Sequence, residues 1–314
     1  MITITIDEKQ IQTEEGRYIL DIALENGIDI PHLCYAKDLE IVSSCRLCLV
    51  EIEGSRKLKT ACSTIAKDGM VVRTKTERLI NHRKNVLQLL LDSHPNDCLT
   101  CQKAGECELQ KYSYQYGVKF RDHDGVKREK IMDLSSPYIA RDDSKCILCG
   151  KCVRTCDVLE ERKILNFQNR GYDTKITLDL NDSFESSYCV SCNRCVSVCP
   201  VGALVDRRSL GKGRTWELDH KTVQCKVCEY GCEFDVLSKN GKNVAVKAKQ
   251  PANGRPLCLK GRLTTELTYL DRPERPYKKV DGEFVESDWE DVLGIKKTIE
   301  KIQKLDRELD LKED

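Results

Sequence analysis

Cysteine is the residue type that most constrains what this chain can fold into. The 314 residues include 19 cysteines, and their spacing divides them into five sets along the chain. Aromatic residues make up 6% of the sequence and charged residues 33%, so one large apolar core is not expected. We therefore expect several small units, each stabilised by its cysteines.

The compartment of the chain predicts the chemical state of these cysteines. The first residues lack the basic and apolar regions of a signal peptide, and no apolar run is long enough to span a membrane, so we expect a cytoplasmic chain without a transmembrane segment. Thiols stay reduced there, and cysteine clusters more often bind metal or carry out redox chemistry. With 52 Lys+Arg against 51 Asp+Glu, charge gives no reason to expect nucleic acid as a partner.

The first set consists of four cysteines in the spacing C-x10-C-x2-C-x13-C, namely Cys34, Cys45, Cys48 and Cys62. Alternating residues predict strands at 2–6 and around 10–12, and a helix over 18–26 should stop at Gly27. This order resembles the β-grasp ferredoxins, and the long first gap resembles the [2Fe–2S] domain that opens the large iron–sulfur subunit of NADH dehydrogenases and NAD-linked hydrogenases and formate dehydrogenases. The resemblance implies one [2Fe–2S] cluster. Zinc is the alternative, because four thiolates suit both.

The second set places one histidine before three cysteines in the spacing H-x3-C-x2-C-x5-C, namely His94, Cys98, Cys101 and Cys107. A [4Fe–4S] cubane needs four ligands, and His94 is the candidate for the fourth. Residues 89–98 and 105–110 resemble the histidine-ligated [4Fe–4S] module of the same families. A neutral imidazole in place of a thiolate makes such a site one charge less negative.

The third and fourth sets are two C-x2-C-x2-C-x3-C runs, which repeat the bacterial ferredoxin pattern. In two-cluster ferredoxins the fourth cysteine of each run ligates the cluster of the other run. The resemblance therefore implies two [4Fe–4S] clusters with the following ligands: Cys146, Cys149, Cys152 and Cys199 for one, and Cys189, Cys192, Cys195 and Cys156 for the other. Asp157 departs from the pattern because a proline, such as Pro200 after the second run, is usual there. Residues 164–176 resemble the hairpin insert of hydrogenase and formate dehydrogenase subunits.

The fifth set has the spacing C-x2-C-x3-C-x25-C and consists of Cys225, Cys228, Cys232 and Cys258. A hairpin is expected around Asn240-Gly241. Residues 256–262 resemble the [4Fe–4S] domain of molybdopterin enzymes, in which a lysine in the place of Lys260 lies between cubane and pterin. An ordinary solvated lysine is the alternative. The residues that follow are too few to enclose a pterin, and Ser287 is expected to cap an amphipathic helix there.

These patterns predict an α+β, multidomain iron–sulfur protein. The expected domains are a β-grasp [2Fe–2S] domain at 1–76, a small helical His-ligated [4Fe–4S] domain at 77–118, a two-cluster ferredoxin domain with a hairpin insert at 119–215, a molybdopterin-oxidoreductase-type [4Fe–4S] domain at 216–275, and a C-terminal tail with an amphipathic helix at 276–314.

The resemblance covers nearly the whole chain and implies an electron-transfer subunit of a multisubunit NAD(P)-linked oxidoreductase, with one [2Fe–2S] and four [4Fe–4S] clusters. It implies as partners a flavin- and NAD-binding subunit and a thioredoxin-like [2Fe–2S] subunit of a complex I-like diaphorase module. A second redox enzyme or ferredoxin would complete the assembly: a formate dehydrogenase, a hydrogenase or an NADP-dependent flavoprotein, with electron bifurcation left open.

No catalytic acid, base or nucleophile stands out in the sequence, and no motif for flavin, NAD or molybdopterin binding is found. Two alternatives remain, a free-standing multi-cluster carrier and a zinc-stabilised interaction protein.

Overall fold

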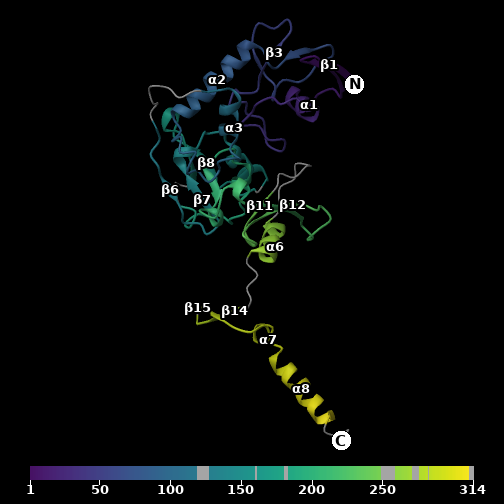
Figure 1. Cartoon of the computed structure of the whole chain (residues 1–314), viewed down its shortest axis with the longest axis vertical. Helices are drawn as coiled ribbons and strands as arrows, with labels where there is room; N and C mark the ends of the chain where they lie inside the picture. The colour runs from purple at the N-terminus through teal and green to yellow at the C-terminus, as the bar shows by residue number, and fades with distance from the viewer. Residues whose placement is uncertain are drawn as a thin grey trace. The chain divides into compact units, whose positions relative to one another are not determined.

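The computed structural model describes residues 1–118, 127–159, 161–179, 183–248, 259–270, 276–281 and 283–310. These residues fall into two compact units, Met1–Thr265 and Glu266–Asp314 (Figure 1). Within the described ranges, no helix is both long and apolar enough to cross a membrane.

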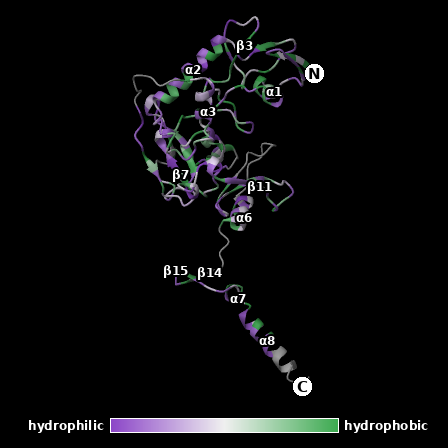
Figure 2. Cartoon of the chain, in the orientation of Figure 1, coloured by the Kyte–Doolittle hydropathy of each residue, from purple (hydrophilic) through white to green (hydrophobic). Residues whose placement is uncertain are grey.

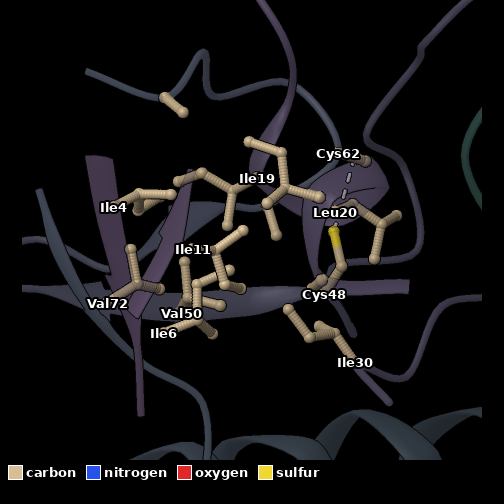
Figure 3. Packing of buried hydrophobic residues seen from close by; sticks show 14 of the residues in the cluster. Ile4, Ile6, Ile11, Ile19, Leu20, Ile30, Cys48, Val50, Cys62 and Val72 are labelled. Carbon is tan, nitrogen blue, oxygen red and sulfur yellow. Dashed lines mark hydrogen bonds between the residues drawn. The ribbon is translucent and has the colours of Figure 1, made fainter. Parts of the chain in front are cut away.

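The first unit begins with a five-stranded sheet and one short helix. Its elements are β1 (Ile2–Ile6), β2 (Lys9–Thr13), α1 (Ile19–Glu25), β3 (Leu49–Ile52), β4 (Lys59–Thr60) and β5 (Val71–Arg73). The strand order is β2-β1-β5-β3-β4, with β1 antiparallel to β2 and parallel to β5. Alternate residues of β1 face the core, where Ile4 and Leu20 share one cluster with Cys48 and Cys62 (Figure 3). The predicted order of strand, strand and helix is confirmed.

Helix α1 ends in a turn that sends the chain toward the first cysteines. Gly27 adopts φ 75°, a left-handed conformation that costs glycine little. The amide of Ile28 then donates to the carbonyl of Ala23 at 2.8 Å, and the amide of Gly27 donates to Leu24 at 3.1 Å. This pair of hydrogen bonds is a Schellman motif, and it confirms the helix stop that was predicted at Gly27.

Two helices follow the sheet, α2 (Glu77–Asp92) and α3 (Glu108–Gln115). Figure 2 shows apolar and polar residues alternating along α2, as expected for a helix with one buried side. Arg83 of α2 is 2% exposed and donates to the carbonyls of Leu47 at 3.2 Å and Leu49 at 2.9 Å. The arginine therefore fixes α2 to strand β3 and to the loop that precedes it.

The next part of the first unit carries the two ferredoxin-like cysteine runs. Its elements are β6 (Met132–Asp133), β7 (Ile139–Asp142), η1 (Asp143–Lys145), α4 (Lys151–Arg154), the π-helical turn η2 (Thr155–Leu159), β8 (Leu165–Gln168), η3 (Gly171–Asp173), β9 (Lys175–Leu178), α5 (Arg194–Val198), β10 (Leu204–Asp206) and η4 (Arg207–Ser209). Strands β10, β7 and β6 form one sheet in that order, and β8 pairs antiparallel with β9. The β8–β9 pair is the hairpin that was predicted between the runs.

The last part of the first unit contains a three-stranded antiparallel sheet. Its elements are η5 (Thr215–Glu217), β11 (Asp219–Gln224), β12 (Glu233–Lys239) and β13 (Lys242–Ala248), followed by α6 (Leu259–Tyr269), which contains the boundary between the units. Asn240 at φ 52° and Gly241 at φ 77° form the two-residue turn between β12 and β13. Positive φ at both positions is what a type I′ hairpin turn requires, so the predicted hairpin is confirmed.

The second unit contains the hairpin β14 (Tyr277–Val280) and β15 (Glu283–Glu286), followed by α7 (Trp289–Val292) and α8 (Lys296–Asp310). The predicted single helix capped by Ser287 is wrong. Asp288 is the N-cap, and its carboxylate accepts from the amide of Asp291 at 2.7 Å. A carboxylate at this position also interacts favourably with the helix dipole. Gly294, at φ 70°, then separates α7 from α8.

Candidate metal centres

The first predicted set lies in the loop between α1 and β3 and directly after β4. The sulfur atoms of Cys48 and Cys62 are 3.4 Å apart (Figure 3). The amide of Cys45 lies 3.5 Å from the sulfur of Cys34, and the amide of Leu33 lies 3.4 Å from the sulfur of Cys45. The loop thus gathers the set as two thiol pairs and turns backbone amides toward the sulfurs.

Each pair shares a proton unequally. Hydrogen bonding to Cys45 lowers the pKa of Cys34, and hydrogen bonding to Cys48 lowers the pKa of Cys62. The same hydrogen bonds, followed by burial, raise the pKa values of Cys45 and Cys48. One thiol of each pair is thereby biased toward the thiolate, which is the form that binds metal.

The second set combines the end of α2 with the loop before α3. His94 is 7% exposed, and its Nε2 atom is buried without a hydrogen-bond partner among the described residues. Its Nδ1 atom accepts from the amide of Asn96 at 3.3 Å. Burial lowers the pKa of His94 to about 4, so the ring is neutral at physiological pH, as a metal ligand must be. Nε2 can ligate a metal only when the ring proton is on Nδ1, and the contact with the amide of Asn96 is then not a hydrogen bond. In that tautomer the orphaned, buried Nε2 atom fits a site that holds a metal group.

The three cysteines of this set lie close enough to influence one another. Burial first, and then the charges of Cys101 and Cys98, raise the pKa of Cys107 to about 11. The sulfur of Cys107 also caps α3 by accepting from the amide of Gln110 at 3.5 Å. The structure therefore brings these thiols together, and His94 of the preceding helix end interacts electrostatically with Asp97 beside them.

The two ferredoxin-like runs exchange their last cysteines. One cavity is lined by four thiols, those of Cys146, Cys149, Cys152 and Cys199. A second cavity is lined by the other four, those of Cys156, Cys189, Cys192 and Cys195. Burial raises the pKa of Cys146 to about 12, and the charge of Cys199 contributes in the same direction. Each cavity therefore gathers three thiols from one run and one thiol from the other.

The backbone after the two runs differs, as the departure at Asp157 suggests. Helix α5 stops just before Cys199, and Pro200, which has no amide hydrogen, prevents its continuation. After Cys156 the chain instead continues as the π-helical turn η2, which an aspartate permits. Cys156 and Cys199 each line a cavity with three cysteines of the other run, although the backbone after them differs.

The structure describes three cysteines of the fifth set, namely Cys225, Cys228 and Cys232. The amide of Cys225 donates to the carbonyl of Cys232 at 2.8 Å, so these two cysteines lie together, while Cys228 is exposed. Cys258 lies outside the described residues. Lys260 is exposed at the start of α6.

Charged residues that the motif analysis missed connect the sets. Lys247 of β13 forms an ion pair with Glu106, next to Cys107, at 2.8 Å. Lys145 is 8% exposed and lies 3.0 Å from Asp97, beside Cys98. Burial by itself would lower the pKa of Lys145, but the hydrogen bond with Asp97 and the charge of Cys101 raise it. The sequence gives no signal for the burial of Lys145, because lysine is among the residues least often buried.

Gly202 marks the close approach of the second set to the ferredoxin-like part. A Cβ atom placed on this glycine would lie 2.7 Å from the sulfur of Cys101 and 3.4 Å from the Cδ atom of Lys145. The first distance is shorter than any normal contact to a sulfur, so the backbone at Gly202 can approach Cys101 because it has no side chain. Sequence spacing gives no sign of this contact.

Gly202→Ala is expected to disturb the second site, because the added methyl group must displace the sulfur of Cys101. We expect about four of the bound irons to be lost or to become labile to chelators, which iron analysis with time would measure. Gly16→Ala is the control, because nothing lies within 4 Å of its added Cβ although φ there is +83°. Equal iron retention in both variants would show that the close contact is unimportant.

Four family models match successive parts of the chain. They describe a 2Fe-2S iron-sulfur cluster binding domain at residues 1–77, an NADH-ubiquinone oxidoreductase-G iron-sulfur binding region at 83–122, a 4Fe-4S dicluster domain at 145–203 and a molybdopterin oxidoreductase Fe4S4 domain at 220–270. Each matched region contains the cysteines of one or two of the sets.

Similar proteins include subunits of an NADH-quinone oxidoreductase and of hydrogenases. A subunit of the NADH-quinone oxidoreductase of Rhizobium meliloti is 40% identical over 93% of this chain and 34% of its own length. NADP-reducing hydrogenase subunit HndD of Solidesulfovibrio fructosivorans is 41% identical over 69% of this chain and 37% of its own length. A chain of the NAD+-reducing [NiFe]-hydrogenase is 31% identical with a TM-score of 0.63, covering 68% of this chain and 90% of that one. This chain thus spans about a third of the two curated relatives.

The fold and the grouped thiols define a multidomain iron–sulfur protein. It contains a 2Fe–2S domain, 4Fe–4S domains and a molybdopterin-enzyme Fe4S4 domain in a mixture of helices and strands. The chain belongs to the family of large iron–sulfur subunits of NADH dehydrogenases and NAD-linked hydrogenases.

Proposed function

We propose that this chain is the electron-transfer subunit of a multisubunit NAD(P)-linked oxidoreductase, relaying single electrons through one [2Fe–2S] and four [4Fe–4S] clusters. The observation that carries the proposal is the close placement of different donor sets inside one compact unit. One nitrogen of Arg154 donates both to the carbonyl of Cys34 at 2.7 Å and to that of Cys149 at 3.2 Å. Gly202, three residues after Cys199, lies against Cys101.

The proposed ligands are four residues for each cluster. The [2Fe–2S] ligands are Cys34, Cys45, Cys48 and Cys62. The four [4Fe–4S] groups are His94, Cys98, Cys101 and Cys107; Cys146, Cys149, Cys152 and Cys199; Cys189, Cys192, Cys195 and Cys156; and Cys225, Cys228, Cys232 and Cys258. For the third and fourth sets, the two thiol-lined cavities support the crossed assignment. We propose no catalytic residue, flavin, NAD or molybdopterin in this chain, and Lys260 as a partner contact.

A bound iron–sulfur cluster supplies reversible one-electron chemistry at a potential set by charge, sulfur hydrogen bonds and solvent exposure. The residues of this chain control all three of these influences. Backbone amides face sulfur atoms, such as Leu148 toward Cys146 at 3.5 Å and Ser191 toward Cys189 at 3.4 Å. These donors stabilise negative charge on the sulfurs, and burial of thiols such as Cys34, Cys48 and Cys195 limits the access of water to their sites.

The matched family models support clusters over zinc. All four describe iron–sulfur domains, and together they contain all five donor sets. Two cavities are each lined by four cysteines, which is the number of protein ligands that one [4Fe–4S] cluster takes.

The proposed partners follow from the relatives, whose names place them in NADH-quinone oxidoreductase and NADP-reducing hydrogenase assemblies. We propose a flavin- and NAD-binding subunit and a thioredoxin-like [2Fe–2S] subunit on one side. A second redox enzyme or ferredoxin would receive or supply electrons on the other.

Iron and acid-labile sulfide in the anaerobically purified chain test the cofactors. About 18 irons per chain are expected from the sum of one [2Fe–2S] and four [4Fe–4S] clusters. Four or five zinc ions without sulfide would refute the proposal in favour of a zinc-stabilised protein. Native purification tests the role: co-purifying oxidoreductase subunits support it, and a monomer that exchanges electrons with unrelated reductases would indicate a free-standing carrier.

A further inference from the structure

Arg154 occupies the junction between the first and third donor sets. It is the last residue of α4, lies between Cys152 and Cys156 in sequence, and is 9% exposed. Its Nη2 atom donates to the carbonyl of Cys34 at 2.7 Å and to the carbonyl of Cys149 at 3.2 Å. A single nitrogen atom therefore joins the backbones of two proposed ligands that lie in different domains.

The remaining donors of the guanidinium strengthen the same junction. Nη1 donates to the carbonyl of Glu40 at 2.5 Å, on the loop that carries the first set. Nε donates to the carbonyl of Gly150 at 3.3 Å, on the side of the third set. The planar guanidinium therefore connects the loop of the β-grasp domain to the start of α4. A lysine ammonium cannot form the same set of hydrogen bonds.

Arg154 also carries a positive charge, so its role differs from that of a neutral residue that only connects two loops by hydrogen bonds. Each of these four acceptors is a neutral backbone carbonyl, although burying a cation costs free energy unless negative charge lies nearby. The thiols of Cys34 and Cys149, whose carbonyls share one guanidinium nitrogen, are close enough to interact electrostatically. Clusters bound at these two sites would supply the negative charge that the carbonyls lack.

We propose that Arg154 is the positioning residue for electron transfer between the first and third sites, holding their ligand loops in contact and placing one positive charge between them. This inference rests on the proposed function. The cation stabilises the reduced state at both sites, and the hydrogen bonds provide a short, rigid connection between Cys34 and Cys149.

Two substitutions in the complete chain separate the charge from the geometry. Arg154→Gln removes the cation, so the equilibrium constant for reduction at both sites should fall about tenfold, which corresponds to about 59 mV for one electron. Arg154→Lys keeps the positive charge, so the potentials should stay near those of the wild type, but it loses the hydrogen bonds that the planar guanidinium donates to both loops. Both variants should slow electron equilibration between the two sites at least tenfold. Redox titration followed by electron paramagnetic resonance, and freeze-quench after rapid reduction, measure these quantities.

Arg207→Gln is the matched control. Arg207 also donates to backbone carbonyls in the same unit, including that of Ser136 at 2.8 Å, but its acceptors are not proposed ligands. It should leave the potentials and the equilibration of the first and third sites unchanged. Iron content is measured for every variant, so that loss of a cluster is distinguished from a change in its properties.

The outcomes separate this inference from the function on which it rests. A wild-type chain without the two clusters, or without electron exchange between them, would refute the proposed function. A wild type that behaves as expected, together with an iron-replete Arg154→Gln variant of unchanged potentials, would overturn the role of Arg154. If Arg154→Gln loses its clusters, Arg154→Lys decides, and an unchanged equilibration rate in that variant would overturn the inference.

Discussion

His94→Ala is expected to remove one whole cluster and leave the other four in place, giving about 14 irons per chain in place of about 18. The structure supplies the reason, because Nε2 of His94 is buried without a partner beside a loop of three thiols. Alanine leaves three ligands for a group that needs four. His94→Cys should instead keep about 18 irons and lower the potential of this cluster, because a thiolate adds one negative charge.

The chain offers a matched control for this experiment. His82, in the middle of α2, also has an Nε2 atom that is buried without a partner among the described residues. It precedes His94 by twelve residues, which corresponds to about 18 Å along a helix axis. His82→Ala should therefore retain about 18 irons. Full iron content in His94→Ala, or an equal loss in His82→Ala, would contradict the assignment of His94 as a ligand.

Local patterns predicted much of the fold and the grouping of the donor residues. Alternation along residues 2–6 and the glycine at position 27 act within a few residues of the elements they define, and β1 and the end of α1 lie as expected. The same holds for the turn at Asn240-Gly241. Three cysteines with two-residue gaps, as in each ferredoxin-like run, must lie close together, so local spacing predicts most of each group. The fourth cysteine comes from the other run.

Contacts between distant residues could not be predicted in this way. The hydrogen bond from Arg154 to Cys34 joins residues 120 positions apart, and no pattern in a single sequence connects them. Gly202 and Cys101 meet for the same reason. The sequence did contain one hint, since Arg154 stands inside a short ligand run whose residues must be buried around the site. Charge alone, however, does not identify the carbonyls that it will bind.

The misplaced helix start in the second unit is a different kind of error. Ser287 and Asp288 are both good N-caps, and the choice between them depends on one residue of register. The structure uses Asp288, while the hydroxyl of Ser287 donates to the carboxylate of Asp291 at 3.0 Å. The prediction of one helix capped by Ser287 also overlooked Gly294, which follows the single turn of α7.

The crossing of the two ferredoxin-like runs gives the second large expected effect. Cys199→Ala should remove the cluster proposed for the first run, since the sulfur of Cys199 shares a cavity with Cys146, Cys149 and Cys152. About 14 irons per chain should remain. Without their cluster, these three thiols should become reactive toward an alkylating agent, while Cys189, Cys192 and Cys195 stay protected. Mass spectrometry of the alkylated peptides identifies which set has been freed.

Cys156→Ala provides the reciprocal test, because its sulfur lies in the cavity of the second run. Here Cys189, Cys192 and Cys195 should become reactive, while the three thiols of the first run remain protected. Ser197→Ala is the control within α5, where it loses a hydrogen bond to the carbonyl of Arg194 but no proposed ligand. Uncrossed ligation predicts the opposite pattern in both cysteine variants, with each substitution freeing the thiols of its own run. The alkylation pattern therefore separates the two connectivities even where the total iron loss is the same.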